Sequence, residues 1–265
     1  MARNGTCWAK KVAELILTKS KTEFVEHVQS NISTLKAYSD TVESIGSGTV
    51  DLKILDIGRL YEPLNFVDPA ALREFYKAHN ISKQIQLVHS LLNIEYNAVI
   101  SYLTIPAVYP EVKELPFDFM HGLTEIIADE SRHYLMLEKI LKDKGYKFGD
   151  FPVNNNILKD LERVDSLMDH ICLVSLTHEG KGIDAGPRLL KSLSYSLDKT
   201  LYDTIKIIVE EEERHVQFGV KWYKYLCNKH SLDLDEYYKT FMTKHGFKIF
   251  NANEAVRKKI GFTFY

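Results

Sequence analysis

Apolar residues recur at helical spacing along most of this 265-residue chain, and their recurrence marks out four long segments. The pattern predicts helices over residues 82–105, 117–144, from about 158 onward, and 199–228. Prolines and glycines fall mainly between these segments, where they suit turns better than helix interiors. The pattern therefore predicts an all-α protein with four main helices.

The connections between the four segments are short, long and short in turn. This order suits antiparallel pairs joined by one long crossover, as in ferritin-like four-helix bundles. Residues 8–45 predict one or two amphipathic helices, and residues 69–79 a short helix with Asp68 as N-cap. We expect residues 1–80 to form an N-terminal helical extension packed on the bundle. The bundle then occupies 81–230, and 231–265 form a C-terminal tail with one or two short helices.

Composition narrows the class of protein. The net charge of −2 argues against nucleic-acid binding through a broad basic surface. Cys7, Cys172 and Cys227 are few, odd in number and far apart, which favours free thiols in a reducing compartment. The sequence shows neither a membrane-spanning stretch nor a signal peptide. We therefore expect a cytoplasmic protein with no membrane partner.

A Glu-x-x-His motif occurs twice, on the second and fourth predicted helices, and the two occurrences lie 82 residues apart. In each case a further glutamate lies a similar distance upstream, 35 residues before the first motif and 33 before the second. A single motif of this kind arises easily by chance, whereas two with matched partners are specific. The six candidate metal ligands are Glu95, Glu130, His133, Glu179, Glu212 and His215.

All six candidates continue apolar rows of their helices, so the pattern predicts that they point inward. Four ionised carboxylates in a dry core would repel one another, and each costs several kcal/mol or more to bury alone. Two divalent cations would balance the four carboxylates. A metal-free network of buried ion pairs is the alternative, but two histidines are too few to compensate four acids. Oxygen ligands with one imidazole per ion favour two iron ions, with manganese or a mixed pair also compatible.

Two acidic residues precede the motif glutamates. Asp129 and Glu211 each lie four residues before a histidine of the motif. Because a metal-bound histidine usually donates its other N–H to a carboxylate or carbonyl, we expect Asp129 to support His215 and Glu211 to support His133. Two solvated acids are an equally good interpretation.

Other polar residues lie near the candidate ligands. His89 and Asn93 are one turn apart shortly before Glu95, where they can form hydrogen bonds beneath the site, although a satisfied core pair explains them as well. Tyrosines at 96, 102 and 134 can carry electrons, but core packing is the simpler explanation.

Several stretches carry a resemblance to known proteins. They are 89–95 (HSLLNIE), 129–133 (DESRH), 148–154 (FGDFPVN), 175–179 (SLTHE) with Asp184, 211–216 (EEERHV) followed by Gly219 and Lys221-Trp222, and 250–262. In these stretches the chain resembles the ferritin-like superfamily of dinuclear carboxylate proteins. Within it, the chain is similar to a widespread family that carries only a domain-of-unknown-function label. The resemblance runs from about residue 55 to the end, and it implies that the same six residues are metal ligands.

The chain departs from the resemblance at His178, where a bulky apolar residue is expected. A histidine beside a ligand can compete for metal or tune it, but we expect this one to face away. Glycines at 180, 182 and 186, with Pro187, predict an interruption of the third helix just after Glu179. The interruption either loosens the helix near the metals or is a simple kink.

The function expected from these features is an oxidoreductase that uses dioxygen, a hydroxylase or oxidase whose metal centre carries the chemistry. Its partners would be dioxygen, an electron donor and a small organic substrate, and a homodimer is compatible with the chain. An alternative is a ferroxidase or other iron-handling or peroxide-scavenging protein without an organic substrate. A third interpretation is a scaffold protein in which the metal site only stabilises the structure.

Overall fold

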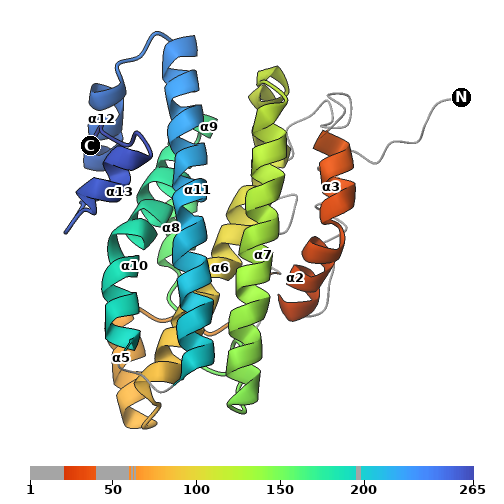
Figure 1. Ribbon diagram of the computed structural model, residues 1–265, viewed down its shortest axis with the longest axis vertical. Coiled ribbons are helices and arrows are strands. Elements are labelled where there is room, and N and C mark those ends of the chain that lie inside the picture. Colours follow the sequence, from red (N-terminus) through yellow and green to blue (C-terminus); the bar gives the residue numbers. More distant parts are fainter. Residues whose placement is uncertain (1–20, 40–59, 61, 63, 195–197) are drawn as a thin grey trace, which may run out of the picture. The chain divides into compact units, whose positions relative to one another are not determined.

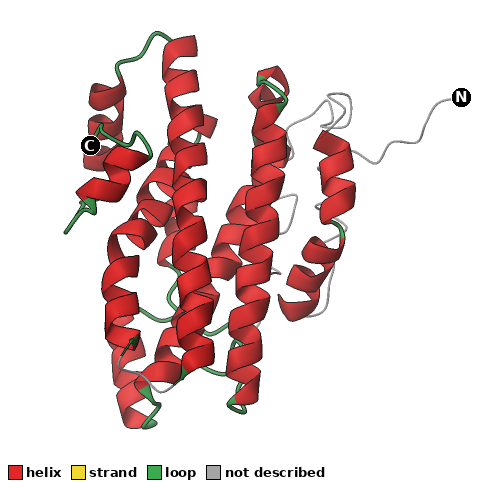
Figure 2. Cartoon of the chain, in the orientation of Figure 1, coloured by secondary structure: helices red, strands yellow, loops and turns green. Residues whose placement is uncertain are grey.

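The computed structural model describes residues 21–39, 60, 62, 64–194 and 198–265. Within these residues the secondary structure is helical, and extended pairing is limited to one isolated bridge between Phe66 and Val153 (Figure 2). The expected all-α class is therefore confirmed for the described part of the chain. The chain divides into two compact units, residues 1–159 and 160–265 (Figure 1). The division into 1–80, 81–230 and 231–265 stays a prediction.

The first unit is built on two long helices, α6 (Lys83–Val108) and α7 (Asp118–Asp143), which pack on each other. A short 3-10 helix, η2 (Pro110–Glu114), lies in the connection between them. The side chain of Ser82 caps α6 by accepting from Ile85 N at 3.3 Å. Both helices lie close to their predicted positions.

One boundary of α6 differs from the prediction. The helix runs past residue 105, so that Pro106 lies inside its last turn and not in the connection. A proline removes only its own N–H, and the ladder resumes beyond it, where Tyr109 N donates to Ile105 O at 3.0 Å. The three prolines at 106, 110 and 116 therefore do not all belong to the turn.

Shorter helices cover the first unit. Both α2 (Lys21–Ser30) and α3 (Ile32–Ser39) pack on α7, and α2 buries Phe24, Val25 and Val28. The predicted helical stretch 8–45 is thus helical where it is described, while 8–20 and 40–45 lie outside the described residues, as do Cys7 and most of 46–63.

The helix predicted at residues 69–79 is α5 (Pro69–Ala78). Its N-cap is the predicted Asp68, whose carboxylate accepts from Ala70 N at 2.8 Å and Ala71 N at 2.9 Å. These bonds satisfy two of the free N–H groups at the start of the helix, and they lower the pKa of Asp68.

The start of the long crossover is fastened to α6 by His89 and Asn93. Gly149 N donates to His89 Nε2 at 3.3 Å, and His89 Nδ1 lies 3.2 Å from Tyr76 Oη. Asn93 Nδ2 donates to Asn154 O at 3.1 Å. Both side chains are therefore satisfied in the core, and their predicted role beneath a metal site stays a prediction.

These contacts hold the His89 ring in its neutral form. Because Gly149 N–H donates to Nε2, this atom carries no proton, and Nδ1 then donates to Tyr76 Oη. Burial lowers the pKa of His89 from 6.5 to about 4, with partial opposition from the Asp150 carboxylate. Protonation of Nε2 would break the bond to Gly149.

We expect the metal-free protein to lose stability as the pH falls from about 6.5 to 4, because the unfolded chain takes up a proton at His89 and the folded chain does not. Stability from this residue is complete above the unfolded pKa. It declines by about 2 kcal/mol by pH 5 and by about 3 kcal/mol in total. Urea unfolding at pH 7.5 and pH 5 measures the loss. His89→Gln should shrink it by that amount, and an equal pH dependence in both proteins would contradict the assignment.

The second unit begins differently from the prediction. A continuous helix from about residue 158 is wrong, because the short α8 (Asn156–Leu161) ends and a new helix starts after Ser166. The Ser166 side chain accepts from Asp169 N at 3.1 Å, which makes it an N-cap. The new helix begins as α9 (Leu167–Ile171).

From α9 the chain continues through η3 (Cys172–His178), a π-helical segment, into α10 (Glu179–Leu193). The predicted interruption after Glu179 is wrong, because the irregular turns precede this residue and the glycines and Pro187 lie inside α10. A π-helical turn contains one residue more than an α-helical turn, and a side-chain hydrogen bond spans this wider turn. Thr177 Oγ1 donates to Cys172 O, five residues earlier, at 2.7 Å.

The helix α11 (Lys199–Lys229), capped by Asp198, packs on both η3 and α10. Two short helices follow, α12 (Leu234–His245) and α13 (Glu254–Lys259), as predicted for the tail. Gly246, with φ 73°, ends α12 in the left-handed conformation that favours glycine.

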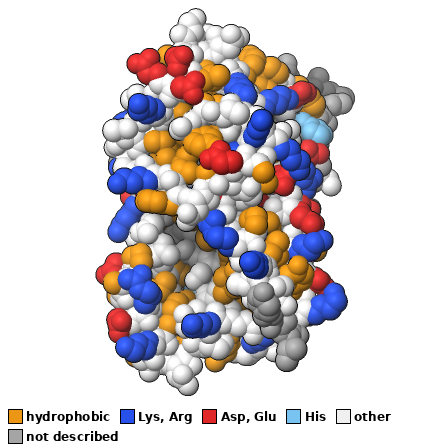
Figure 3. Space-filling model, turned by 60° about the vertical axis from the view of Figure 1, so that its left-hand side comes forward, with side chains coloured by type: hydrophobic (Ala, Val, Ile, Leu, Met, Phe, Trp, Pro, Cys, Tyr) orange, Lys and Arg blue, Asp and Glu red, His pale blue; other side chains and the backbone are white. Residues whose placement is uncertain are grey.

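The described residues bear on three expectations from composition. Cys172 and Cys227 are free and buried, as expected for thiols outside a disulfide framework. Among the described helices, none combines the length and the apolar character that a membrane crossing requires. Basic side chains are spread over the face drawn in Figure 3, with acidic and apolar side chains between them.

Candidate metal centre

Three of the six predicted ligands meet in the first unit. Glu95 comes from α6, and Glu130 and His133 lie one turn apart on α7. His133 Nδ1 lies 3.3 Å from Glu95 Oε2 and 3.8 Å from Glu130 Oε2. Each residue offers one ligand atom within 4.8 Å of the others, and all three side chains are buried. We call these three residues the first triad.

The other three predicted ligands meet in the second unit. Glu179 is the first residue of α10, and Glu212 and His215 lie one turn apart on α11. His215 Nδ1 lies 3.3 Å from Glu212 Oε2, and one ligand atom from each residue again lies within 4.8 Å of the others. All three are buried. We call them the second triad, which has the same composition as the first.

Glycines lie where the elements around the second triad pass close to one another. At Gly182 an added Cβ would lie 3.7 Å from Glu212 Cγ, which is an ordinary contact distance, so this position has room for a methyl group. At Gly219 an added Cβ would lie closer than 3.0 Å to Ser175 Cβ, which real Cβ atoms essentially never show. The glycine is therefore required where α11 crosses η3.

Without a cation the first triad is electrostatically strained. Burial, followed by the neighbouring Glu130 carboxylate, raises the pKa of Glu95 well above its usual range, and His133 opposes the rise. Oε2 of Glu95 and Oε2 of Glu212 are buried and make no hydrogen bond of normal geometry within the described residues. In each triad this oxygen lies 3.3 Å from Nδ1 of the histidine, so a carboxylate oxygen and an imidazole nitrogen face each other where one cation can bind both.

The donor set suits a hard divalent cation. Each triad offers carboxylate oxygens and one imidazole nitrogen, which are ligands for iron, manganese or zinc. Burial raises the pKa of the Cys172 thiol well above its usual range, and this residue belongs to neither triad. A divalent cation would neutralise two carboxylates. The structure therefore contains buried carboxylate and histidine clusters that can hold a metal ion.

The predicted supporting acids have partners on their own helices. Asp129 Oδ1 lies 2.8 Å from Arg132 Nη2, and Glu211 Oε1 lies 3.3 Å from Arg214 Nη2. Both side chains are only partly exposed. Support of His215 by Asp129 and of His133 by Glu211 stays a prediction.

His178 is directed to the tail of its own unit. Its Nε2 lies 3.3 Å from Asp160 Oδ2, and its ring packs edge-on against Phe247. Burial lowers the pKa of His178, and Asp160 opposes the shift. Neither triad includes this histidine.

The tyrosines near the first triad pack in the core. Tyr96, Tyr102 and Tyr134 are fully buried, and the rings of Tyr96 and Tyr134 lie 5.8 Å apart. Tyr96 Oη donates to Leu60 O at 2.6 Å. Tyr96 and Tyr134 therefore have the contacts of packed core residues, and Tyr102 shares their burial.

Two residues of the C-terminal segment that contact η3 and α10 were not found from the sequence. Tyr238 reaches Thr177, and Arg257 pairs with Asp184. Asp184 appeared only within a stretch of resemblance. Arg257 lies 73 residues beyond its partner, and no local pattern connects positions so far apart.

Comparison with known protein families gives a match over nearly the whole chain. The model of a family described as "Protein of unknown function (DUF455)" matches residues 17–264. A Haemophilus influenzae protein described as uncharacterized is 26% identical over 185 residues, which cover 66% of this chain. The matched region spans only 64% of that relative's length. No solved structure shows significant similarity to the chain. Because the family model covers nearly all of the sequence, the chain belongs to the DUF455 family.

Proposed function

We propose that the two triads together bind one pair of metal ions and that their helices form a ferritin-like four-helix bundle. The observation that carries the proposal is the repetition of one buried donor set, two carboxylates and one imidazole, in each unit. The doubled Glu-x-x-His motif with its matched upstream glutamates is the ligand pattern of dinuclear carboxylate bundles. The proposed ligands are Glu95, Glu130, His133, Glu179, Glu212 and His215.

The proposal names iron as the first metal, with manganese or a mixed pair as the nearest substitutes. Oxygen-rich sites with one imidazole per ion suit both metals, and the triads contain no thiolate. Three protein ligands per ion are too few for octahedral coordination, so shared carboxylates would raise the number to about four and leave the remaining positions for solvent or dioxygen. Each histidine would then bind a single ion through Nδ1, the nitrogen that faces the carboxylates.

The activity we propose is oxidation of an organic substrate by dioxygen, as in a hydroxylase or an oxidase. When bound, the metal pair would supply the redox chemistry. The residues of the chain hold the ligand geometry and exclude bulk water, since all six side chains are buried. Hydroxylation of a C–H bond consumes one dioxygen, two electrons and two protons and releases one water. An electron donor is therefore a required partner if the protein is a hydroxylase, whereas an oxidase would take its electrons from the substrate.

We expect protein purified from iron-supplemented cells to contain about two metal ions per chain. After anaerobic reduction, dioxygen uptake is followed with a continuous supply of reductant. Turnover that rises with a library of small organic compounds would support the oxygenase, and an oxidised product would identify the substrate class.

Two other results would redirect the proposal. Uptake that depends only on added iron(II) or peroxide, whatever organic compound is present, would favour the iron-handling or peroxide-consuming alternative. Protein that takes up no iron, manganese or zinc after dialysis against each would reject the dinuclear site.

A further inference from the structure

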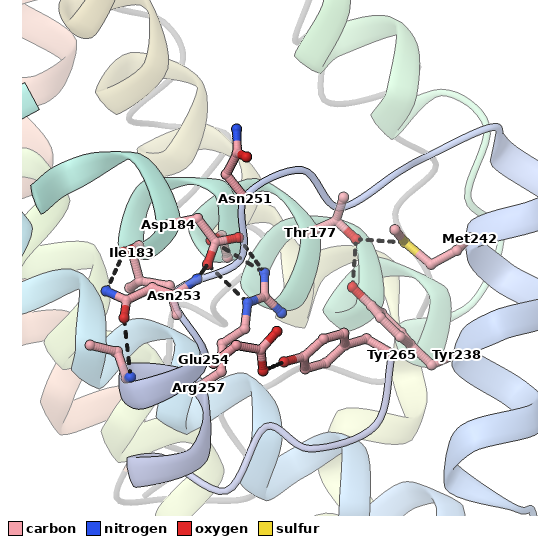
Figure 4. A network of polar contacts seen from close by, with 12 residues as sticks. Thr177, Ile183, Asp184, Tyr238, Met242, Asn251, Asn253, Glu254, Arg257 and Tyr265 are labelled. Atoms are coloured by element: carbon pink, nitrogen blue, oxygen red, sulfur yellow. Dashed lines mark hydrogen bonds and ion pairs between the residues drawn. The ribbon is translucent and has the colours of Figure 1, made fainter. Parts of the chain in front are cut away.

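The C-terminal segment, residues 234–265, contacts Thr177 of η3, two residues before Glu179, and Asp184 of α10, five residues after it (Figure 4). On the side before Glu179, Tyr238 Oη of α12 lies 3.2 Å from Thr177 Oγ1. Thr177 Oγ1 also lies 3.6 Å from Met242 Sδ. These contacts reach the last turn of the π-helical segment η3, two residues before the proposed ligand.

On the side after Glu179, Arg257 of α13 pairs with Asp184 of α10. Arg257 Nε donates to Asp184 Oδ1 at 2.9 Å, and Nη2 donates to Oδ2 at 2.7 Å. The same Oδ1 accepts from Asn253 N at 2.8 Å. Two parallel bonds fix the orientation of both planar groups. We call this pair of bonds the Arg257 fork.

The surroundings hold the fork rigidly. Arg257 is 2% exposed, and its guanidinium lies 4.4 Å from the ring centre of Phe262 and 4.7 Å from that of Tyr265. Its Nη2 also lies 3.5 Å from Gly180 O, the carbonyl next to the proposed ligand Glu179. An added Cβ at Gly180 would lie only 3.3 Å from Nη2, so the absence of a side chain allows this approach.

A buried ion pair contributes little net stability compared with an apolar pair of the same shape. Its effect is geometric, because the fork permits only one arrangement of α13 relative to α10. Metal ligands must be held to within about 0.5 Å of their working positions by the contacts around them. The fork acts on the turn that begins with Glu179, where such precision is required.

We propose that Arg257 is a positioning residue for Glu179, acting through Asp184 and the first turn of α10. The inference rests on the proposed function only for the role of Glu179 as a ligand. The contact of Tyr238 with Thr177 holds the preceding π-helical turn in the same way. The C-terminal segment thus sets the direction in which the second triad presents its first carboxylate.

The first test uses the metal-free full-length protein and hydrogen exchange of the amides at residues 180–184. Arg257→Gln and Asp184→Asn remove the fork from either side. We expect exchange in this turn to rise about tenfold or more in both variants. Tyr237→Phe is the matched control, because it removes the hydrogen bond of 2.8 Å from the same C-terminal segment to Asp169 of α9 and leaves both bonds of the fork in place. The control should leave exchange at 180–184 unchanged.

The second test measures binding of manganese(II) or iron(II) to the same proteins. We expect the fork variants to bind one ion about 10- to 100-fold more weakly than the wild type and Tyr237→Phe to retain both ions. Unchanged exchange at 180–184 in the fork variants, or an equal rise in Tyr237→Phe, would overturn the positioning role. So would metal affinity that falls equally in all three variants. Absence of metal from the wild type would reject the dinuclear site, and the exchange result would then decide the positioning role alone.

Discussion

Replacing Glu130 with alanine is expected to remove both metal ions from the protein, and Glu212→Ala should do the same. Each triad has only three ligands, so the proposed centre depends on carboxylates that are shared between the ions. Loss of either motif glutamate removes a shared ligand. It also leaves three carboxylates to balance the four positive charges of two divalent cations. Metal analysis after dialysis against iron(II) or manganese(II) measures the loss.

The expected change in stability gives an independent measure. Free metal at 100 times the dissociation constant stabilises the folded protein by about 2.7 kcal/mol per site, and the variants should gain none of this. Glu138→Ala is the matched control. Glu138 is a buried glutamate on the same helix, paired with Lys142 at 3.0 Å and belonging to neither triad. It should keep both ions.

The pattern of loss separates two kinds of site. If Glu130→Ala and Glu212→Ala each retain one ion, the triads are separate mononuclear sites and the shared centre is wrong. If both variants retain two ions, neither triad binds metal.

Gly219→Ala is expected to destabilise the protein by about 2 kcal/mol, although alanine is the better helix former. Overpacking costs about 1–3 kcal/mol and the gain in helix propensity returns only about 1 kcal/mol, so a clash at the upper end of that range leaves a net loss. The added methyl would meet Ser175 Cβ and lie 3.3 Å from the Ser175 carbonyl carbon. Backbone cannot move aside as the end of a flexible side chain can. Urea unfolding of the metal-free protein measures the change.

Gly182→Ala is the control for this substitution, because its methyl would meet Glu212 only at ordinary contact distances of 3.7 and 3.8 Å. It should be neutral or stabilising by about 0.4–1 kcal/mol. Adding Ser175→Gly to Gly219→Ala should recover part of the lost stability, since it removes the atom that the new methyl meets. Equal stability of Gly219→Ala and the wild type would show that the crossing of α11 and η3 tolerates a Cβ.

Helix positions followed from the sequence because the signals that define them are local. Asp68 before Pro69, Ser82 before residue 83 and Asp198 before residue 199 each act as caps in the structure. The motif residues came together within each unit for a similar reason, since Glu130 and His133 share one turn of α7. Matching them with Glu95 required only one helix pair with a short connection.

Features that depend on distant contacts did not follow from the sequence. Pro106 is tolerated inside α6 because the helical hydrogen bonds resume after it. No pattern of residues in the sequence predicts this. The π-helical turns of η3 are fixed partly by Tyr238, which lies 61 residues beyond Thr177. An α-helical period places Glu179 on the face of Cys172 and Ser175. The predicted burial of Glu179 is confirmed, although that period does not apply across η3.

The direction in which the Glu179 side chain points depends on how η3 is wound and on how many residues it contains. A π-helical turn holds one residue more than an α-helical turn, so winding residues 172–178 as a regular α-helix without losing a residue would turn Glu179 by about 100° around the axis. The apolar stripe that follows would rotate with it. Removal of one residue from this stretch, with a return to α-helical winding, would instead leave Glu179 facing nearly the same way. A sequence that aligns with this chain but carries a one-residue gap inside the segment can therefore keep its carboxylate in the same position.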